Sequence, residues 1–273
     1  MIIDGKKLAE EIKAELKAEV FGLNKKIRLA VVKVGDDKVT EKFLEQKKKF
    51  GEAVGIDVRI YDLPETISTN QLRKKLAEIV HIKENTGVIV QLPLPKQINP
   101  QYILDAIMPG KDPDMLSSKS VGLFSSGRSK ILPPVVGAIK YIFDKHNVDV
   151  RSKKAVVIGA GRLVGKPAAN WLINQGAAVT VIDENIADPT LHTTDADIII
   201  SGVGEPNLVG PQMVKDGVIA IDCGTSEAAG KLLGDFNQKV ADKASIFTPV
   251  PGGVGPLTVA MLFKNLVELI KKS

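Results

Sequence analysis

Cysteine is almost absent from the sequence, since Cys223 is the only one among 273 residues. A single thiol cannot form an internal disulfide, so we expect a protein of a reducing compartment. No apolar run approaches the ~18 residues of a membrane span. The first residues, Met1 to Gly5, also lack the apolar core of a secretory signal peptide. We therefore expect a cytoplasmic protein that does not bind membranes.

Aromatic residues are also scarce, at 4% of the chain. This argues against the stacking platforms that bind single-stranded nucleic acid, so we expect no nucleic-acid partner. The net charge is +5, and the lysines are spread along the chain. Solvated helix faces account for such a distribution, and an anionic small-molecule ligand is the alternative. We expect no metal site, because no metal-ligand spacing links Cys223 to the histidines His81, His146 and His192.

A glycine-containing turn organises the second half of the chain. The apolar run from Ala155 to Ile158 predicts a buried parallel strand. Gly159 and Gly161 then permit a tight turn, and the helix that follows offers free N–H groups to a pyrophosphate. Gly165 comes one residue later than in the usual Gly-x-Gly-x-x-Gly pattern. A plain tight turn is the alternative interpretation.

A second predicted strand, residues 178–182, ends on Asp183. This acid lies 24 residues past Gly159, near the ~20-residue offset at which a carboxylate meets the adenine ribose. The combination favours dinucleotide binding. A carboxylate accepts hydrogen bonds from a free ribose diol and repels a 2′-phosphate, so the sequence favours NAD over NADP.

Strands and helices alternate over residues 29–107 and again over 134–223, which predicts an α/β fold in two domains. We expect an N-terminal α/β domain and a doubly wound, Rossmann-type cofactor domain, with a cleft between them. The Gly-, Ser- and Asp-rich stretch 109–128 is the expected boundary. The first domain should span residues 1–120 and 255–273, closed by the C-terminal helix, and the second residues 121–254.

Periodicity and capping residues locate the individual elements. Ser68 with Gln71 forms a capping box, and Asn99 precedes a proline at a first helical position. We expect helices at about 6–20, 40–54, 68–80, 99–107 and 258–271, and strands at 29–34, 58–61, 87–92, 155–158 and 178–182.

Lys47 interrupts the apolar face of the predicted helix 40–54, which Phe43, Phe50 and Val54 mark. Such a lysine either extends to water or has a function. In a cleft, loss of hydration would lower its pKa and make it a general acid or base near neutral pH.

Three further segments are ambiguous on their own. Gln91 is an amide at the C-terminal end of a strand, where α/β sheets bind ligands. The segment Lys111 to Asp114 reads as a turn. The loop from Thr248 to Thr258 is rich in Gly, Pro and Thr, exposes backbone groups and leads straight into a helix.

Together these segments resemble the methylenetetrahydrofolate dehydrogenase/cyclohydrolase family, the FolD proteins, over essentially the whole chain. The loop before the last helix is the longest and most specific match. The matching motifs are Val34 to Asp37, Thr40 to Lys49, Gly55-Ile56, Gln91 to Pro95, Lys111 to Met115 and Pro249 to Thr258.

The resemblance implies NAD- or NADP-dependent oxidation of 5,10-methylene-tetrahydrofolate and hydrolysis of the methenyl product to 10-formyl-tetrahydrofolate. It implies catalytic roles for Lys47, Gln91 and Asp114, and a homodimer. It further implies substrate-binding residues at Phe43, Lys47, Gln91, Leu92, Asp114, Pro251, Gly252 and Gly253. The implied cofactor-binding residues are Gly159, Ala160, Gly161, Arg162, Gly165, Asp183, Val203, Gly204 and Thr225.

The chain departs from the family pattern at several positions. Phe43 replaces a tyrosine and keeps the ring without the hydroxyl. Met115 replaces a glycine, and Leu132 to Val135 replace Pro-Cys-Thr-Pro. Gly161 replaces a serine of the phosphate turn, and Asp183 with Glu184 replaces polar or basic residues, both of which favour NAD. A dehydrogenase of another substrate, shikimate-type or amino-acid-type, and a folate-binding homologue without catalysis are the alternatives.

Overall fold

The computed structural model describes residues 1–35, 38–228 and 231–271. These residues form two compact units. One, which we call the five-stranded unit, contains Met1–Ala9 and Val135–Thr258. The other, the three-stranded unit, contains Glu10–Pro134 and Val259–Ser273. Both alternate strands with helices, which confirms the predicted α/β class. Of the expected turn Gly35 to Asp37, Asp36 and Asp37 lie outside the described residues.

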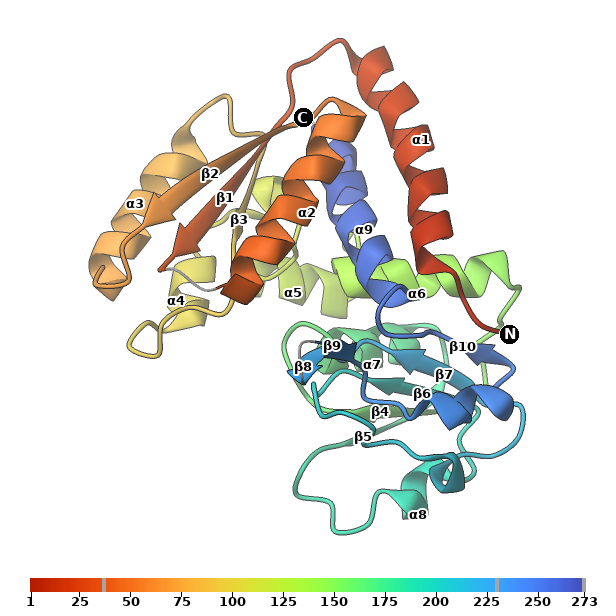
Figure 1. The fold of residues 1–273 in the computed structure, drawn as a ribbon. Coiled ribbons are helices and arrows are strands. Elements are labelled where there is room, and N and C mark those ends of the chain that lie inside the picture. The colour runs from red at the N-terminus through yellow and green to blue at the C-terminus, as the bar shows by residue number, and fades with distance from the viewer. Residues whose placement is uncertain (36–37, 229–230, 272–273) are drawn as a thin grey trace. The chain divides into compact units, whose positions relative to one another are not determined.

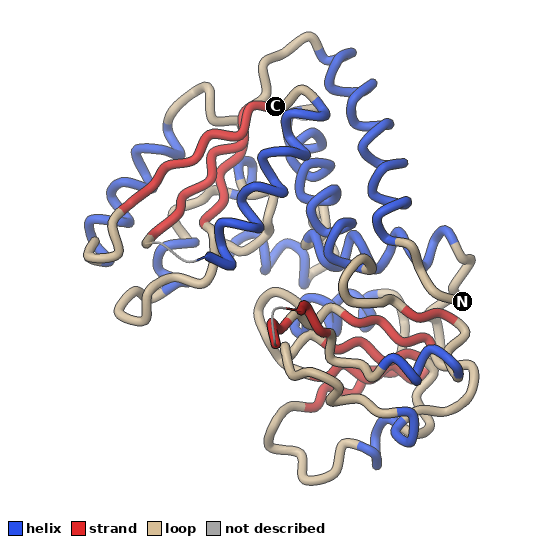
Figure 2. The backbone as a smooth tube through the Cα atoms, in the orientation of Figure 1, coloured by secondary structure: helices blue, strands red, loops and turns tan. Residues whose placement is uncertain are grey.

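In the three-stranded unit the described strands pair in parallel in the order β2-β1-β3 (Figure 2). β3 and the interior of β1, from Leu29 to Lys33, are buried and mostly apolar, as strands covered on both faces must be. The exception in β1 is the buried Lys33, whose ammonium lies 3.5 Å from the Asp62 carboxylate on β2. The elements are β1 (Arg28–Val34), β2 (Asp57–Leu63), β3 (Gly87–Val90), α2 (Lys38–Val54), α3 (Thr69–His81), α4 (Pro100–Leu104), η1 (Pro109–Lys111) and α5 (Ser118–Ser125), with most of α1 (Gly5–Leu23) and α9 (Val254–Ile270).

Helices lie on both faces of this sheet (Figure 1). On one face, Leu72 and Leu76 of α3 join Ala30 and Val32 of β1 in a single buried cluster. On the other lie α2 and α9, whose Phe50 and Phe263 rings stack with their centroids 5.1 Å apart. Side chains of β1 pack against the helices on both faces of the sheet, because successive residues of a strand point to opposite faces.

In the five-stranded unit the described strands are parallel in the order β10-β7-β6-β4-β5. Numbered along the chain this is the order 2-1-3-4-5 of a doubly wound sheet, with the order reversing between β4 and β6. The predicted Rossmann-type class is therefore confirmed. The elements are β4 (Lys154–Ile158), β5 (Ala178–Ile182), β6 (Ile198–Ser201), β7 (Ile219–Asp222), β10 (Ile246–Phe247), α6 (Pro134–Lys145), α7 (Gly165–Asn174), α8 (Thr190–Thr193), η2 (Pro211–Met213), η3 (Gln238–Asp242) and the antiparallel pair β8 (Ser226–Ala228) and β9 (Lys231–Leu233).

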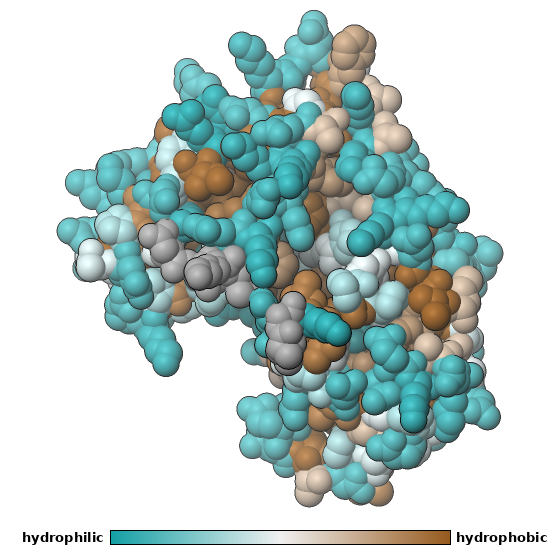
Figure 3. All heavy atoms as spheres, viewed as in Figure 1, coloured by the Kyte–Doolittle hydropathy of each residue, from teal (hydrophilic) through white to brown (hydrophobic). Residues whose placement is uncertain are grey.

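The first residues of the chain extend this sheet. Ile2 forms a parallel bridge with Phe247, and the amide of Ile3 donates to the carbonyl of Phe247 at 2.9 Å. The sequence did not predict this pairing, because three residues are too few to show the alternation of apolar and polar residues that marks a strand. None of the described helices is long and apolar enough to cross a membrane. On the face seen in Figure 3 most residues are hydrophilic, with apolar ones scattered among them.

Several boundaries differ from the expectation. α9 begins at Val254 and so includes Gly255 and Pro256, since a proline is tolerated in a first turn, where its missing N–H is not needed. β3 ends at Val90, before Gln91. The stretch 109–128 contains η1 and α5, because the hydroxyl of the buried Ser117 accepts from the amide of Ser120 and caps α5.

The capping box at α3 is confirmed. The hydroxyl of Ser68 accepts from the amide of Gln71 at 3.4 Å, and the side chain of Gln71 accepts from the amide of Ser68 at 3.0 Å. We expect Ser68→Ala to lower the free energy of unfolding by ~1 kcal/mol, because the amide of Gln71 loses the hydroxyl that caps it. Urea denaturation measures this, with Ser68→Asp, an equally good cap, as the control. Equal stability of Ser68→Ala and the unchanged protein would contradict it.

Candidate active site

Lys47 lies on α2 and does not extend into water. Its ammonium donates to the side-chain oxygen of Gln91 at 2.7 Å, and the residue is half-buried. The predicted apolar face is buried at Phe50 and Val54, but Phe43 is 38% exposed. Phe43 therefore stands at the open end of this face, one helical turn before the lysine.

Gln91 directly follows β3, at the carboxyl end of the parallel sheet. Its amide N–H continues the ladder by donating to the carbonyl of Val32 at 2.9 Å. Its side-chain NH₂ donates to the carbonyl of Leu92 at 2.8 Å. The NH₂ group is thus engaged by the neighbouring backbone, which leaves the amide oxygen to face Lys47.

Asp114 lies in an anchored turn. The buried Asp112 carboxylate accepts from the amide of Ser117 at 2.9 Å and from its hydroxyl at 2.7 Å, which closes the turn around Asp114. Lys111 donates to the carbonyls of Val80 and Ile82, at the end of α3. The interpretation as a turn was right, and buried polar contacts fix its conformation.

The two charges of the site influence each other. Burial lowers the pKa of the Lys47 ammonium, while the negative charge of Asp114 raises it. Burial raises the pKa of Asp114 to about 6, against the effect of Lys47 and with a smaller contribution from Asp112. A lowered pKa brings proton exchange by the lysine closer to neutral pH, which favours general acid–base chemistry.

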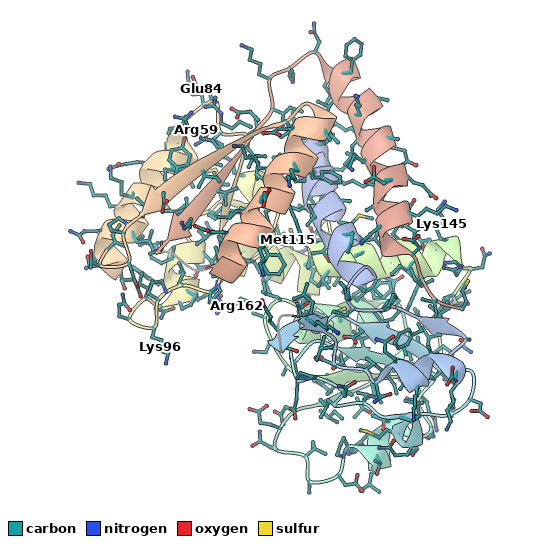
Figure 4. The ribbon with its side chains drawn as sticks, viewed as in Figure 1. Arg59, Glu84, Lys96, Met115, Lys145 and Arg162 are labelled. Carbon is teal, nitrogen blue, oxygen red and sulfur yellow. The ribbon has the colours of Figure 1, made fainter. Side chains whose placement is uncertain are left out.

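Met115 follows Asp114 with a left-handed backbone, at φ 60° (Figure 4). Only glycine adopts this region without a steric penalty, which explains the glycine of the family pattern. The Met115 side chain is buried, and its sulfur lies 3.9 Å from the hydroxyl of Ser129. The methionine therefore packs into the interior of its unit.

The glycine turn after β4 has the predicted close geometry. Gly159 has φ 93°, and its amide donates to the carbonyl of Ile182 at 2.7 Å. A Cβ on Gly165 would overlap the carbonyl of Gly159. α7 thus begins directly against the turn, even though this glycine comes one residue late.

The predicted cofactor residues all lie at the carboxyl ends of β4 to β7, in the five-stranded unit. The segment with Val203 and Gly204 follows β6, next to β4 where the strand order reverses, and that is where dinucleotides bind in such sheets. Asp183 follows β5 and accepts from the amide of Asn185 at 3.0 Å. Thr225 follows β7, and Ala160, Gly161 and Arg162 are exposed after β4. Of these residues, Arg162 is labelled in Figure 4. An open turn beside a helix N-terminus fits a dinucleotide.

The loop residues Pro251, Gly252 and Gly253 also belong to the five-stranded unit, whereas Lys47, Gln91 and Asp114 belong to the three-stranded unit. Gly252 has φ 104°, and the amide of Gly253 donates to the carbonyl of Pro249 at 2.8 Å. A Cβ on Gly5 would overlap the carbonyl of Gly253, so the start of α1 packs directly on this loop.

Two buried acids escaped the sequence analysis, Asp222 and Asp235. Burial raises the pKa of Asp222 to about 6, although backbone N–H groups of Phe236 and Asp235 favour its ionised form. An acid that ends the apolar run of β7, and a second acid between Gly234 and Phe236, were the available signs. In the described part of the chain, no group of three or more His, Cys, Asp or Glu could hold a metal ion.

The chain matches the sequence models of two protein domains. Residues 3–114 match the tetrahydrofolate dehydrogenase/cyclohydrolase catalytic domain. Residues 133–273 match the NAD(P)-binding domain of the tetrahydrofolate dehydrogenase/cyclohydrolases. The chain belongs to the tetrahydrofolate dehydrogenase/cyclohydrolase family. The family and the fold predicted from the sequence are therefore confirmed, and the predicted activities are the two for which the family is named.

Individual members of the tetrahydrofolate dehydrogenase/cyclohydrolase family match over their full length. The chain is 42% identical to the bifunctional protein FolD of Nautilia profundicola, over 99% of this chain and 97% of that one. The crystal structure of the bifunctional FolD enzyme from Campylobacter jejuni superposes with a TM-score of 0.96 at 37% identity, over 100% and 99% of the two chains. The Trypanosoma brucei FolD, solved with NADP and an inhibitor, gives 0.94 at 31% identity, over 100% and 97%.

The coupling of the two charges can be measured. We expect Asp114→Asn to lower the pKa of Lys47, because the carboxylate that stabilises the ammonium is removed while the burial stays. An NMR titration of the lysine ε-carbons measures this pKa. Asp62→Asn, at an exposed carboxylate beside Lys33, is the matched control and should leave the Lys47 pKa unchanged. An unchanged Lys47 pKa in Asp114→Asn would show that the two groups do not interact.

Proposed function

We propose that this protein oxidises 5,10-methylene-tetrahydrofolate to the methenyl compound with NAD or NADP, and then hydrolyses that cation to 10-formyl-tetrahydrofolate. The observation that carries the proposal is the Lys47 ammonium, half-buried and hydrogen-bonded to Gln91 in the unit that also contains Asp114. We assign folate binding to residues 1–120 with 255–273, and the cofactor to residues 121–254.

In the hydrolytic step Lys47 acts as the base. Burial lowers its pKa, and the positive charge of the methenyl substrate favours the neutral amine further. The water oxygen bonds to the methenyl carbon while its proton passes to Lys47. As the new hydroxyl loses its proton to solvent and becomes the formyl C=O, the bond from that carbon to N5 breaks. N5 takes up the proton held by Lys47, and the formyl group stays on N10. Gln91 holds the amine in place, because its own amide orientation is fixed by Leu92.

Asp114 binds the pterin in this proposal. An ionised carboxylate accepts two hydrogen bonds, from the ring N–H and from the exocyclic amine. Since its pKa is about 6, this pairing is complete above that pH and is lost as the pH falls through it. The exposed ring of Phe43 stacks on the aminobenzoate, with Leu92 beside Gln91. Pro251, Gly252 and Gly253 offer backbone groups to the folate.

A bound dinucleotide would supply the hydride acceptor. Gly159, Ala160, Gly161, Arg162 and Gly165, in the turn and at the start of α7, would hold its pyrophosphate. Asp183 would accept from the adenine ribose, and Val203, Gly204 and Thr225 would line the site at the neighbouring strand ends. We infer a preference for NAD, because the carboxylate of Asp183 would repel a 2′-phosphate and Gly161 adds no hydroxyl to bind one.

We also propose a homodimer in the cytoplasm. β5 ends the strand order of its sheet, and its Val181 is 44% exposed, while Ile173 on α7 is 59% exposed. An edge strand with apolar neighbours is a surface that a second copy can extend.

Replacing Lys47 by alanine tests the hydrolytic step. We expect Lys47→Ala to reduce the rate of methenyl hydrolysis by roughly 10²- to 10⁴-fold, because the base is gone. Loss of the methenyl absorbance measures the rate. The neighbouring Lys48→Ala, at an exposed position, is the matched control and should retain full activity. An unchanged hydrolysis rate in Lys47→Ala would contradict the role of the lysine, and folate binding without turnover in the unchanged protein would indicate a homologue that has lost catalysis.

Cofactor preference is tested by following methenyl formation with NAD and NADP in parallel. We expect a higher kcat/KM with NAD, and we expect Asp183→Ser to raise kcat/KM with NADP by about tenfold, since the repulsion of a 2′-phosphate is removed. Asp188→Asn, at an exposed acid of the same unit, should change neither value. A clear advantage for NADP in the unchanged protein would refute the preference.

A further inference from the structure

Asp235 is fully buried and accepts four hydrogen bonds, all from the end of β6 and the loop after it. One carboxylate oxygen accepts from the hydroxyl of Ser201 at 2.6 Å and from the amide of Val203 at 2.8 Å. The other accepts from the amides of Gly204 and Glu205, each at 3.0 Å. A single side chain thus fixes three consecutive peptide N–H groups.

This pattern needs a side chain with two acceptor oxygens. Both oxygens must accept, and each faces two donors. An asparagine would turn its NH₂ group toward at least one backbone N–H and leave that N–H unpaired in the interior, which is costly. The arrangement therefore specifies aspartate at this position, beyond its size and shape.

A second buried acid holds Asp235 in place. The Asp222 carboxylate, at the end of β7, accepts from the amides of Gly224 at 3.0 Å, Asp235 at 3.1 Å and Phe236 at 2.9 Å. A Cβ on Gly224 would overlap the Asp235 carboxylate, and a Cβ on Gly234 would overlap that of Asp222. The two acids and the two glycines thus form a connected support that runs from β7 to the β6 loop.

The supported loop lies at the reversal of the strand order. Its Val203 is 43% exposed, and its side chain stands so close to Gly159 that a Cβ there would almost overlap it. Asp183 follows β5, on the side that we assign to the adenine of a bound dinucleotide, and the turn assigned to the pyrophosphate follows β4. β6, on the opposite side of β4, therefore faces the nicotinamide half.

We propose that Asp235 is a positioning residue that holds the Val203–Glu205 loop against the nicotinamide half of the dinucleotide. Since Asp235 engages the N–H groups of the loop, the loop presents its carbonyl oxygens and the Val203 side chain to the ligand. This inference rests on the proposed function, because it requires that the five-stranded unit binds NAD or NADP.

The test compares two ligands on the whole protein. NAD and ADP-ribose share the adenosine, the pyrophosphate and the second ribose, and differ only in the nicotinamide ring, which ADP-ribose lacks. By titration calorimetry we expect Asp235→Asn to raise the Kd of NAD by about tenfold and to leave the Kd of ADP-ribose within about twofold, because only the β6 loop loses its partners. Asp216→Asn, at an exposed acid of the same unit, should change neither Kd.

A purely structural role of Asp235 would weaken both ligands equally. That outcome, or an unchanged Kd for NAD in a folded Asp235→Asn protein, would overturn the role of Asp235 and would leave the proposed function unaffected. Failure of the unchanged protein to bind NAD, NADP or ADP-ribose would overturn the proposed function as well. If Asp235→Asn does not fold, Ser201→Ala removes one of the four hydrogen bonds, and the same selective loss, smaller in size, is then required.

Discussion

The ammonium of Lys47 donates to an uncharged acceptor, the amide oxygen of Gln91, at 2.7 Å. A carboxylate in that position would stabilise the charged amine and keep its pKa high. An amide orients the amine and adds no such bias, so burial remains the main influence on its pKa. The parallel sheet makes this pairing possible, because β3 delivers Gln91 at its carboxyl end and α2 passes beside that end with Lys47.

The two units stabilise their functional loops in the same way. In each, a buried aspartate accepts from consecutive backbone amides and from one serine hydroxyl. Asp112 does so with Ser117, in the turn that carries Asp114, and Asp235 does so with Ser201, in the loop after β6. Loops without regular secondary structure lose their conformational freedom through such contacts. A loop held in this way can present polar groups to a ligand without a large ordering cost.

The sequence predicted the helices and strands that depend on residues close together in the chain. Strand runs such as Ala155 to Ile158 and the capping box at Ser68 depend on neighbours in the chain, and both were found where expected. Lys47 and Gln91 were singled out one at a time by position. Their pairing could not be derived from periodicity, since the two residues are 44 positions apart. The contact between Asp235 and Ser201 spans 34 positions and involves mostly backbone donors, which leave no trace in the side-chain pattern.

Gly224 and Gly234 each face the carboxylate of the opposite acid, Asp235 and Asp222 respectively. Gly224 is therefore constrained together with Asp235, and Gly234 together with Asp222. Among homologous sequences, loss of either aspartate should free the glycine opposite to it to acquire a side chain, so that each pair changes together or not at all. Covariation between these alignment columns would then report a steric dependence at positions away from Lys47, Gln91 and Asp114.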